Sequence, residues 1–148
     1  MENLEQIIQN IKKDFFSYRN GIVANSLKGL YPSATIIFGL MVPQFMDLVA
    51  KYPKNLELAL KLWSNKSDRE SRLFALYIIP VEKVDFATAK SMAKDVRSIE
   101  EADFLSFKVL RNIPNANNLF EELSKENNPA PIYQYCLQMF KKNLDLSQ

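Results

Sequence analysis

The stretch that decides the fold is KLWSNKSDRESRLFALYIIP, residues 61–80, in which a polar break separates two apolar segments. Apolar side chains on either side of the break recur every three or four positions, which is the spacing of one face of an α-helix. The first stripe contains Leu56, Ala59, Leu60 and Trp63, and the second contains Leu73, Leu76, Tyr77 and Pro80. The stretch therefore predicts a helix–turn–helix unit, in which we expect Trp63 to have a packing role.

The same unit recurs along the chain at a nearly constant interval. Ser67 begins a Ser-x-x-Glu capping box and Ser98 begins another, while Asn128 precedes Pro129 as an N-cap precedes a proline at the first helical position. These three starts lie 31 and 30 residues apart. The interval predicts an all-α fold, an α-α superhelix of HEAT-like helical repeats. The alternative is a compact helical bundle whose loops are evenly spaced.

We expect one HEAT-like repeat domain over residues 1–148. Its irregular N-terminal part, residues 1–52, has a predicted helix from about Glu2 to Tyr18 and another from Pro43 to about Tyr52. Pro32 and Gly39 interrupt the pattern between them, which leaves the conformation of residues 20–42 open. The helix pairs are predicted at about 53–80, 85–111 and 115–143.

Composition narrows the class of protein. The chain is 47% hydrophobic and 24% charged, as in ordinary globular domains. It has no histidine, which removes the commonest general base and the commonest zinc ligand. Cys136 is the one cysteine, and its apolar helical surroundings predict a buried, unreactive thiol.

The sequence also carries expectations about location. The longest apolar run, residues 34–43, is too short to cross a bilayer, and the N-terminus lacks the pattern of a secretory signal. We therefore expect a cytoplasmic protein with no membrane partner, no metal and no other cofactor.

Three segments are similar to blocks of one known family. They are FGLMVPQFMDLVAKY (38–52), LALKLWSNKSDRESRLFAL (58–76) and RSIEEADFLSFKVL (97–110). They share an aromatic-Gly-apolar-x-x-Pro turn, a Leu-Trp pair followed by a glutamate, and an aspartate in the first turn of a later helix. In these features the chain resembles the DNA alkylation repair family, the HEAT-like-repeat alkylpurine DNA glycosylases. The resemblance implies a superhelix whose concave face carries DNA and an activity that removes positively charged alkylated purines.

By position in these blocks, Asp103 matches the family's catalytic aspartate. A cationic alkylbase is already a good leaving group, so it needs a carboxylate to stabilise the developing charge and aromatic faces to hold the cation. The family's tryptophan four residues earlier is Ile99 here, and its later arginine falls near Gln134 or Tyr135, with no arginine after Arg111. These departures predict little or no glycosylase activity. Alternatively, Asp103 only interacts with the dipole of its helix.

Basic residues on the second helices form the candidate DNA surface. The net charge of +2 is too small to indicate a nucleic-acid partner by itself, so a local patch must supply the attraction. Arg69 and Arg72 are three apart and could meet phosphates from one helix face, although pairing with Asp68 and Glu70 is the alternative. The predicted contacts to double-stranded DNA are Lys66, Arg69, Arg72, Lys108 and Arg111. Phe104, Phe107 and Phe120 are either stacking platforms for bases or core residues.

The sequence therefore predicts a relative of the DNA alkylation repair proteins that binds the DNA backbone on a concave face. Two alternatives stay open, a protein-binding repeat scaffold and an active alkylpurine DNA glycosylase, so that enzymatic activity is undecided. An uncapped terminal repeat would expose an apolar face, which favours a protein partner or a homodimer.

Overall fold

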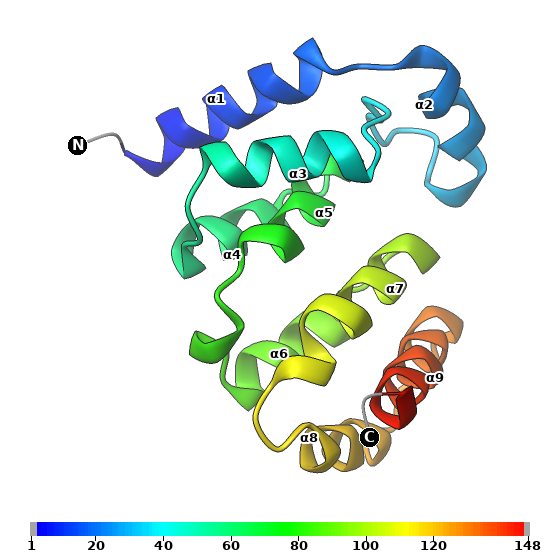
Figure 1. Cartoon of the computed structure of the whole chain (residues 1–148). Coiled ribbons are helices and arrows are strands. Elements are labelled where there is room, and N and C mark those ends of the chain that lie inside the picture. Colours follow the sequence, from blue (N-terminus) through cyan, green and yellow to red (C-terminus); the bar gives the residue numbers. More distant parts are fainter. Residues whose placement is uncertain (1–2, 147–148) are drawn as a thin grey trace. The chain divides into compact units, whose positions relative to one another are not determined.

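The computed structural model of the protein describes residues 3–146, and these residues form an all-α structure (Figure 1). Between residues 3 and 146 there are nine α-helices, three short 3-10 helices, one isolated β-bridge and no strand. The predicted all-α class is confirmed. The superhelical course of HEAT-like repeats stays a prediction.

Two compact units make up the chain, unit 1 (Met1–Ile79) and unit 2 (Pro80–Gln148). Compactness alone does not decide whether two units fold together, so a single domain over residues 1–148 also stays a prediction. The predicted start of the first helix at Glu2 lies outside the described residues.

Unit 1 is centred on a helix that is buried on every side. Its elements are α1 (Leu4–Ser17), α2 (Gly21–Leu27), η1 (Lys28–Leu30), α3 (Val42–Lys51), α4 (Leu56–Ser64) and α5 (Arg69–Ile78). All ten residues of α5 are buried, and α5 packs against α3 and α4. The aromatic ring of Phe74 on α5 meets Phe15 of α1 edge-on, with ring centroids 5.9 Å apart. A helix so enclosed brings its polar side chains into the interior together with its apolar ones.

Residues 20–42, which the sequence left open, contain α2, η1 and a return segment. The backbone N–H of Asn20 donates to the carbonyl of Phe38 at 2.8 Å, which ties the start of α2 to this segment. Gly39 has φ of +94°, and a Cβ atom there would lie 2.3 Å from the carbonyl oxygen of Asn20. Only glycine fits this close approach of two backbones.

Unit 2 is built around its last helix. Its elements are η2 (Val81–Lys83), α6 (Phe86–Lys94), α7 (Ile99–Lys108), η3 (Leu110–Asn112), α8 (Ala116–Ser124) and α9 (Pro131–Leu146). α9 packs against α6, α7 and α8, and the hydroxyl of its buried Tyr133 donates to the carbonyl of Leu123 at 2.7 Å. Cys136 on the same helix is fully buried, and this burial raises the pKa of its thiol to about 11. The predicted burial of Cys136 is confirmed, and the raised pKa favours the predicted low reactivity of its thiol.

The predicted helix starts were right in one case and wrong in two. Ser98 caps α7, since its hydroxyl accepts a hydrogen bond from the N–H of Glu101 at 3.1 Å. The predicted cap at Ser67 is wrong, because Asp68 is the N-cap of α5. A carboxylate is as good an acceptor for the free N–H groups as a hydroxyl, so a run of neighbouring polar residues does not identify the capping residue by itself.

The predicted start of the last helix is also wrong. Asn128 caps a turn instead, with its side-chain oxygen accepting from the N–H of Ala130 at 3.1 Å, and α9 begins at Pro131. Asparagine favours both arrangements, because its side chain bonds to the backbone two residues further on as readily as it caps a helix.

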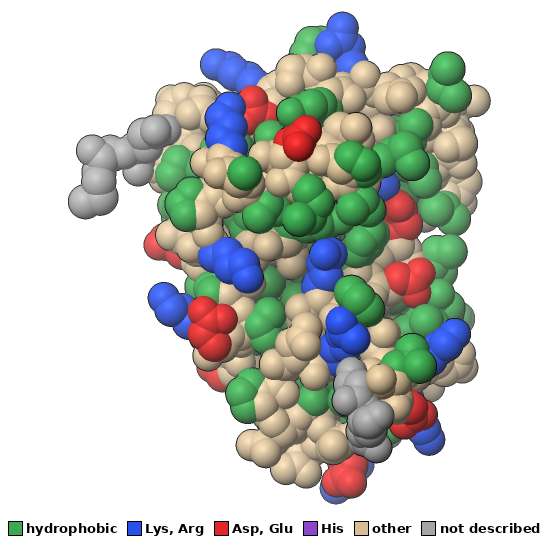
Figure 2. Space-filling model, viewed as in Figure 1, with side chains coloured by type: hydrophobic (Ala, Val, Ile, Leu, Met, Phe, Trp, Pro, Cys, Tyr) green, Lys and Arg blue, Asp and Glu red, His purple; other side chains and the backbone are tan. Residues whose placement is uncertain are grey.

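The surface carries both charges and some apolar side chains. In Figure 2, Lys and Arg side chains lie among Asp and Glu side chains in each unit, and hydrophobic side chains gather over α3. Val42 and Met46 of α3 are about half exposed, at 51% and 52%. Within residues 3–146, the structure contains no helix with the length and apolar character required of a membrane span.

Candidate functional site: an acidic, aromatic pocket in unit 2

A pocket of about 510 Å³ opens between α7 and α9. Side chains three or four positions apart on α7 form one wall, and side chains four apart on α9 form the other, as helical spacing requires. The lining residues are Glu100, Asp103, Phe104 and Phe107 of α7 and Tyr135, Met139 and Asn143 of α9. We call this site the Asp103 pocket.

Asp103 and Tyr135 join the two walls. The hydroxyl of Tyr135 donates a hydrogen bond to Oδ1 of Asp103 at 2.8 Å. This bond to the carboxylate, together with partial burial, raises the pKa of the Tyr135 phenol, which therefore stays protonated at neutral pH. Oδ2 of Asp103 has no partner among the described residues, and Asp103 is exposed. One carboxylate oxygen of Asp103 is thus held by a residue of α9, and Asp103 is accessible to solvent.

The pocket combines negative charge with aromatic faces. Glu100 and Asp103 are the charged groups of its lining, and Phe104, Phe107 and Tyr135 supply aromatic rings. Carboxylates and aromatic faces both attract cations, and flat rings also stack. The Asp103 pocket is therefore suited to a flat, positively charged group.

Two basic side chains flank the pocket. The guanidinium carbon of Arg111 lies 3.7 Å from the ring centroid of Phe107, and its Nε donates to the carbonyl oxygen of Phe107 at 2.6 Å. The ammonium of Lys108 lies 5.9 Å from the ring centroid of Phe104. Stacking on Phe107 holds the guanidinium group of Arg111 beside the pocket. Its terminal nitrogens can then donate to an anion such as a phosphate.

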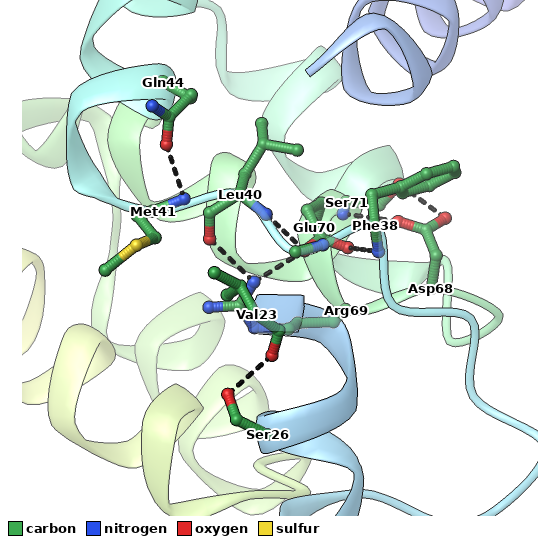
Figure 3. Close-up of polar contacts among 11 residues, drawn as sticks. Val23, Ser26, Phe38, Leu40, Met41, Gln44, Asp68, Arg69, Glu70 and Ser71 are labelled. Carbon is green, nitrogen blue, oxygen red and sulfur yellow. Dashed lines mark hydrogen bonds and ion pairs between the residues drawn. The ribbon is translucent and has the colours of Figure 1, made fainter. Parts of the chain in front are cut away.

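Arg69 lies in unit 1 and is buried, with only 5% of its surface exposed (Figure 3). Its Nη1 donates to the carbonyl of Leu40 at 2.9 Å and to Oε2 of Glu70 at 2.6 Å. The pairing with Glu70, which the sequence left as the alternative, is therefore the one observed. Its burial argues against the predicted contact to a DNA phosphate.

Arg72 is also buried, with 1% of its surface exposed. Its guanidinium carbon lies 3.8 Å from the ring centroid of Trp63, and its Nη1 donates to the carbonyl of Trp63 at 2.6 Å. Trp63 is itself buried, which confirms its predicted packing role. Like Arg69, Arg72 does not present its guanidinium to an outside ligand.

The predicted site residues therefore fall into two groups. Asp103, Lys108 and Arg111 lie around one pocket in unit 2. Lys66 is exposed between α4 and α5 of unit 1, the same unit as the two buried arginines. Of the candidate stacking residues, Phe104 and Phe107 line the pocket, whereas Phe120 packs edge-on against Phe140 of the core.

From the sequence, Tyr135 was named only because it lies near the position at which the family has an arginine. The signal that marks it is the spacing of Tyr135, Met139 and Asn143, which places them on one stripe of α9. From the sequence alone, these three residues on one side of α9 cannot be told from residues that pack into a core, because the helix that faces them is not known. Among the described residues, no three Cys, Asp or Glu side chains gather in a way that could hold a metal ion.

The fold and pocket define an all-α protein with an acidic, aromatic site between two packed helices. The family model described as DNA alkylation repair enzyme matches residues 11–130, and the chain belongs to this family. Comparison with curated proteins and with solved structures gave no match. The matched range contains Asp103, Lys108 and Arg111 but ends before Tyr135.

Proposed function

We propose that the protein binds DNA that carries a cationic alkylated purine, with little or no glycosylase activity. In this proposal the Asp103 pocket receives the positively charged base or the strained nucleotide that bears it. Lys108 and Arg111 contact neighbouring phosphates, and Lys66 is a further backbone contact. The pocket then belongs to the concave face of a helical-repeat superhelix.

The observation that carries the proposal is the composition of the Asp103 pocket. A purine that is alkylated on a ring nitrogen has a formal positive charge delocalised over a flat ring. A carboxylate oxygen without a partner, at Asp103, and the aromatic rings of Phe104 and Phe107 match this charge and this shape. Membership of the DNA alkylation repair enzyme family supports the choice of DNA as the ligand.

The rim supports the contact to the backbone. Arg111 is held in place by its stack on Phe107, so little side-chain freedom is lost when its fork meets a phosphate. Each neutralised phosphate adds about 0.9 to the slope of log affinity against log salt. Two or three contacts therefore give a shallow but measurable salt dependence.

The test is fluorescence anisotropy of two labelled duplexes of identical sequence, one with 7-methylguanine and one with guanine, at two salt concentrations. We expect tighter binding of the methylated duplex and a loss of that preference in Asp103→Asn. Glu121→Gln, which removes an exposed carboxylate on α8, is the matched control and keeps the preference. Equal binding of both duplexes by the wild-type protein contradicts the proposal.

The phosphate contacts have a separate test. Arg111→Ala should weaken binding of both duplexes by a similar factor and reduce the salt slope by about one. The matched control is Lys125→Ala, at an exposed lysine beyond α8. An unchanged salt slope in Arg111→Ala rules out its contact to a phosphate. If the protein binds neither duplex at low salt, the alternative function as a protein-binding scaffold is favoured.

Excision of the base is a second candidate function, and one observation favours it. The partner-free oxygen of Asp103 lies in a pocket with aromatic faces, and these are the two features that excision of a cationic base requires. Release of free 7-methylguanine from the methylated duplex, abolished by Asp103→Asn, would establish it. Release that persists in Asp103→Asn excludes Asp103 from the chemistry.

A further inference from the structure

An exposed arginine covers an exposed aromatic ring at the end of α1 in unit 1. The guanidinium carbon of Arg19 lies 4.0 Å from the ring centroid of Phe16, and its Nη1 donates to the carbonyl of Phe16 at 3.0 Å. Phe16 is 55% exposed, and Arg19 is exposed as well, unlike the buried Arg69 and Arg72 of the same unit. The core of unit 1 therefore does not account for this pair.

The same arrangement flanks the Asp103 pocket in unit 2. There the guanidinium of Arg111 covers the ring of Phe107 and donates to the carbonyl of the same phenylalanine. Phe107 is 50% exposed. In both pairs the phenylalanine lies in the last turn of an α-helix, and the arginine follows just beyond the end of that helix. We therefore expect the two pairs to meet ligands of the same chemistry.

We propose that the Phe16–Arg19 pair is a second contact to the phosphate backbone of double-stranded DNA, in the unit that does not contain the Asp103 pocket. This inference rests on the proposed function, because it takes DNA as the ligand. It goes beyond the proposed function by assigning a backbone contact to the end of α1, where the sequence pattern predicted none.

Arg19 has hydrogen-bond donors left for an anion. A guanidinium carries N–H groups on each of its nitrogens, in a planar fork that matches the oxygens of a phosphate. The contact to the carbonyl of Phe16 uses Nη1, and Nε and Nη2 have no partner among residues 3–146. Asp14, the acid nearest to Arg19 in the chain, is paired with Lys51 instead. The charge of Arg19 is therefore not neutralised by a carboxylate of the described residues.

The position of Arg19 is fixed in the free protein. Its own N–H donates to the carbonyl of Phe16 at 3.1 Å, and the next N–H, that of Asn20, donates to the carbonyl of Phe38 at 2.8 Å. These bonds hold the backbone, and the contact with the ring of Phe16 holds the side chain. A guanidinium held in this way loses little conformational freedom when it meets a phosphate.

The experiment measures fluorescence anisotropy of the 7-methylguanine and guanine duplexes at several salt concentrations. Arg19→Ala should weaken binding of both duplexes by roughly tenfold at low salt and reduce the salt slope by about one, with the preference for the methylated duplex unchanged. Lys54→Ala is the matched control, because Lys54 is exposed in unit 1 and adjoins Pro53, which lines a pocket with Leu4 at the other end of α1. It should leave the salt slope unchanged.

Phe16→Leu separates the charge of Arg19 from its orientation. It keeps an apolar side chain and removes the ring, so the salt slope should stay that of the wild type while both duplexes bind roughly threefold more weakly. The buried side chains of α1 are Ile11 and Phe15, so neither substitution reaches the core. An arginine that only caps the end of α1 and interacts with its dipole predicts wild-type binding in both variants, and that result overturns the inference.

A double variant compares the two pairs directly. In Arg19→Ala/Arg111→Ala the salt slope should fall by about two, because the two arginines belong to different units and share no partner, so that their effects add. A slope that falls in Arg111→Ala but not in Arg19→Ala overturns this inference alone. A wild-type protein that binds neither duplex at low salt overturns the proposed function with it.

Discussion

The side chain of Glu70 is fully buried. Replacing it by glutamine should therefore destabilise unit 1 severely, although the substitution conserves the size of the side chain. The carboxylate of Glu70 ties the start of α5 to the return segment before α3 (Figure 3). Oε1 accepts from the N–H of Phe38 at 2.9 Å, and Oε2 accepts from Gly39 at 3.0 Å and Leu40 at 3.3 Å. Oε2 also accepts from the guanidinium of Arg69 at 2.6 Å.

The magnitude follows from what an amide cannot do. In Glu70→Gln one oxygen still accepts, but the new NH₂ group meets a donor, and at least one backbone N–H of the return segment loses its partner. The buried Arg69 loses its counter-charge and keeps its bond to the carbonyl of Leu40. Removing one partner of a buried ion pair costs about 3–5 kcal/mol. For a protein of this length, that corresponds to a fall in Tm of roughly 10 °C.

The assay is urea unfolding together with hydrogen exchange. Glu57→Gln is the matched control, because Glu57 is exposed in the first turn of α4, and its loss should cost about 0.5 kcal/mol. The amides of Phe38, Gly39 and Leu40 should exchange faster in Glu70→Gln than in the control. A loss of stability below about 1 kcal/mol, with exchange of these amides unchanged, would refute the reasoning.

Three further perturbations follow from the same structure. Gly39→Ala should cost at least about 2 kcal/mol in urea unfolding, because φ is +94° and a Cβ would meet backbone oxygen at 2.3 Å, whereas Gly29→Ala, with open space around it, should be nearly neutral. Arg72→Lys keeps the charge but loses the planar stack on Trp63, so it should cost about 2 kcal/mol and change the emission of this single tryptophan; a cost under about 0.5 kcal/mol would contradict the role of the stack. Burial raises the thiol pKa of Cys136 from 9.0 to about 11, so its contribution to stability is complete below pH 9 and is lost as pH rises from about 9 to 11. Between pH 8 and pH 10.5 the wild type should therefore lose roughly 2 kcal/mol more than Cys136→Ala, and parallel losses in urea unfolding would contradict the raised pKa.

Local signals in the sequence determined the helical class and the start of α7. Apolar side chains every three or four residues can be buried together only on a helix, and Ser98 caps α7 because its hydroxyl meets N–H groups three residues away in the chain. The same kind of reasoning placed Trp63 in a core stripe and Cys136 in an apolar one. These features depend on neighbours within one or two helical turns.

Tertiary structure decided which faces are covered. The spacing of Arg69 and Arg72 shows that they share a side of one helix. Both are buried, and they donate to the carbonyls of Leu40 and Trp63, which precede α5 in the chain. A charged residue in sequence is compatible with solvent and with a buried partner alike, and only the packed neighbours distinguish the two.

The Asp103 pocket, too, was predicted from the sequence only in part. The sequence supplied Asp103, Phe104 and Phe107 at helical spacing, together with the basic residues that follow them. It did not supply Tyr135, because a hydrogen bond between residues 32 positions apart exists only once α7 and α9 pack against each other. Periodicity is a property of one helix, whereas a site between two helices depends on how their surfaces fit, and that fit is set by the whole core of unit 2.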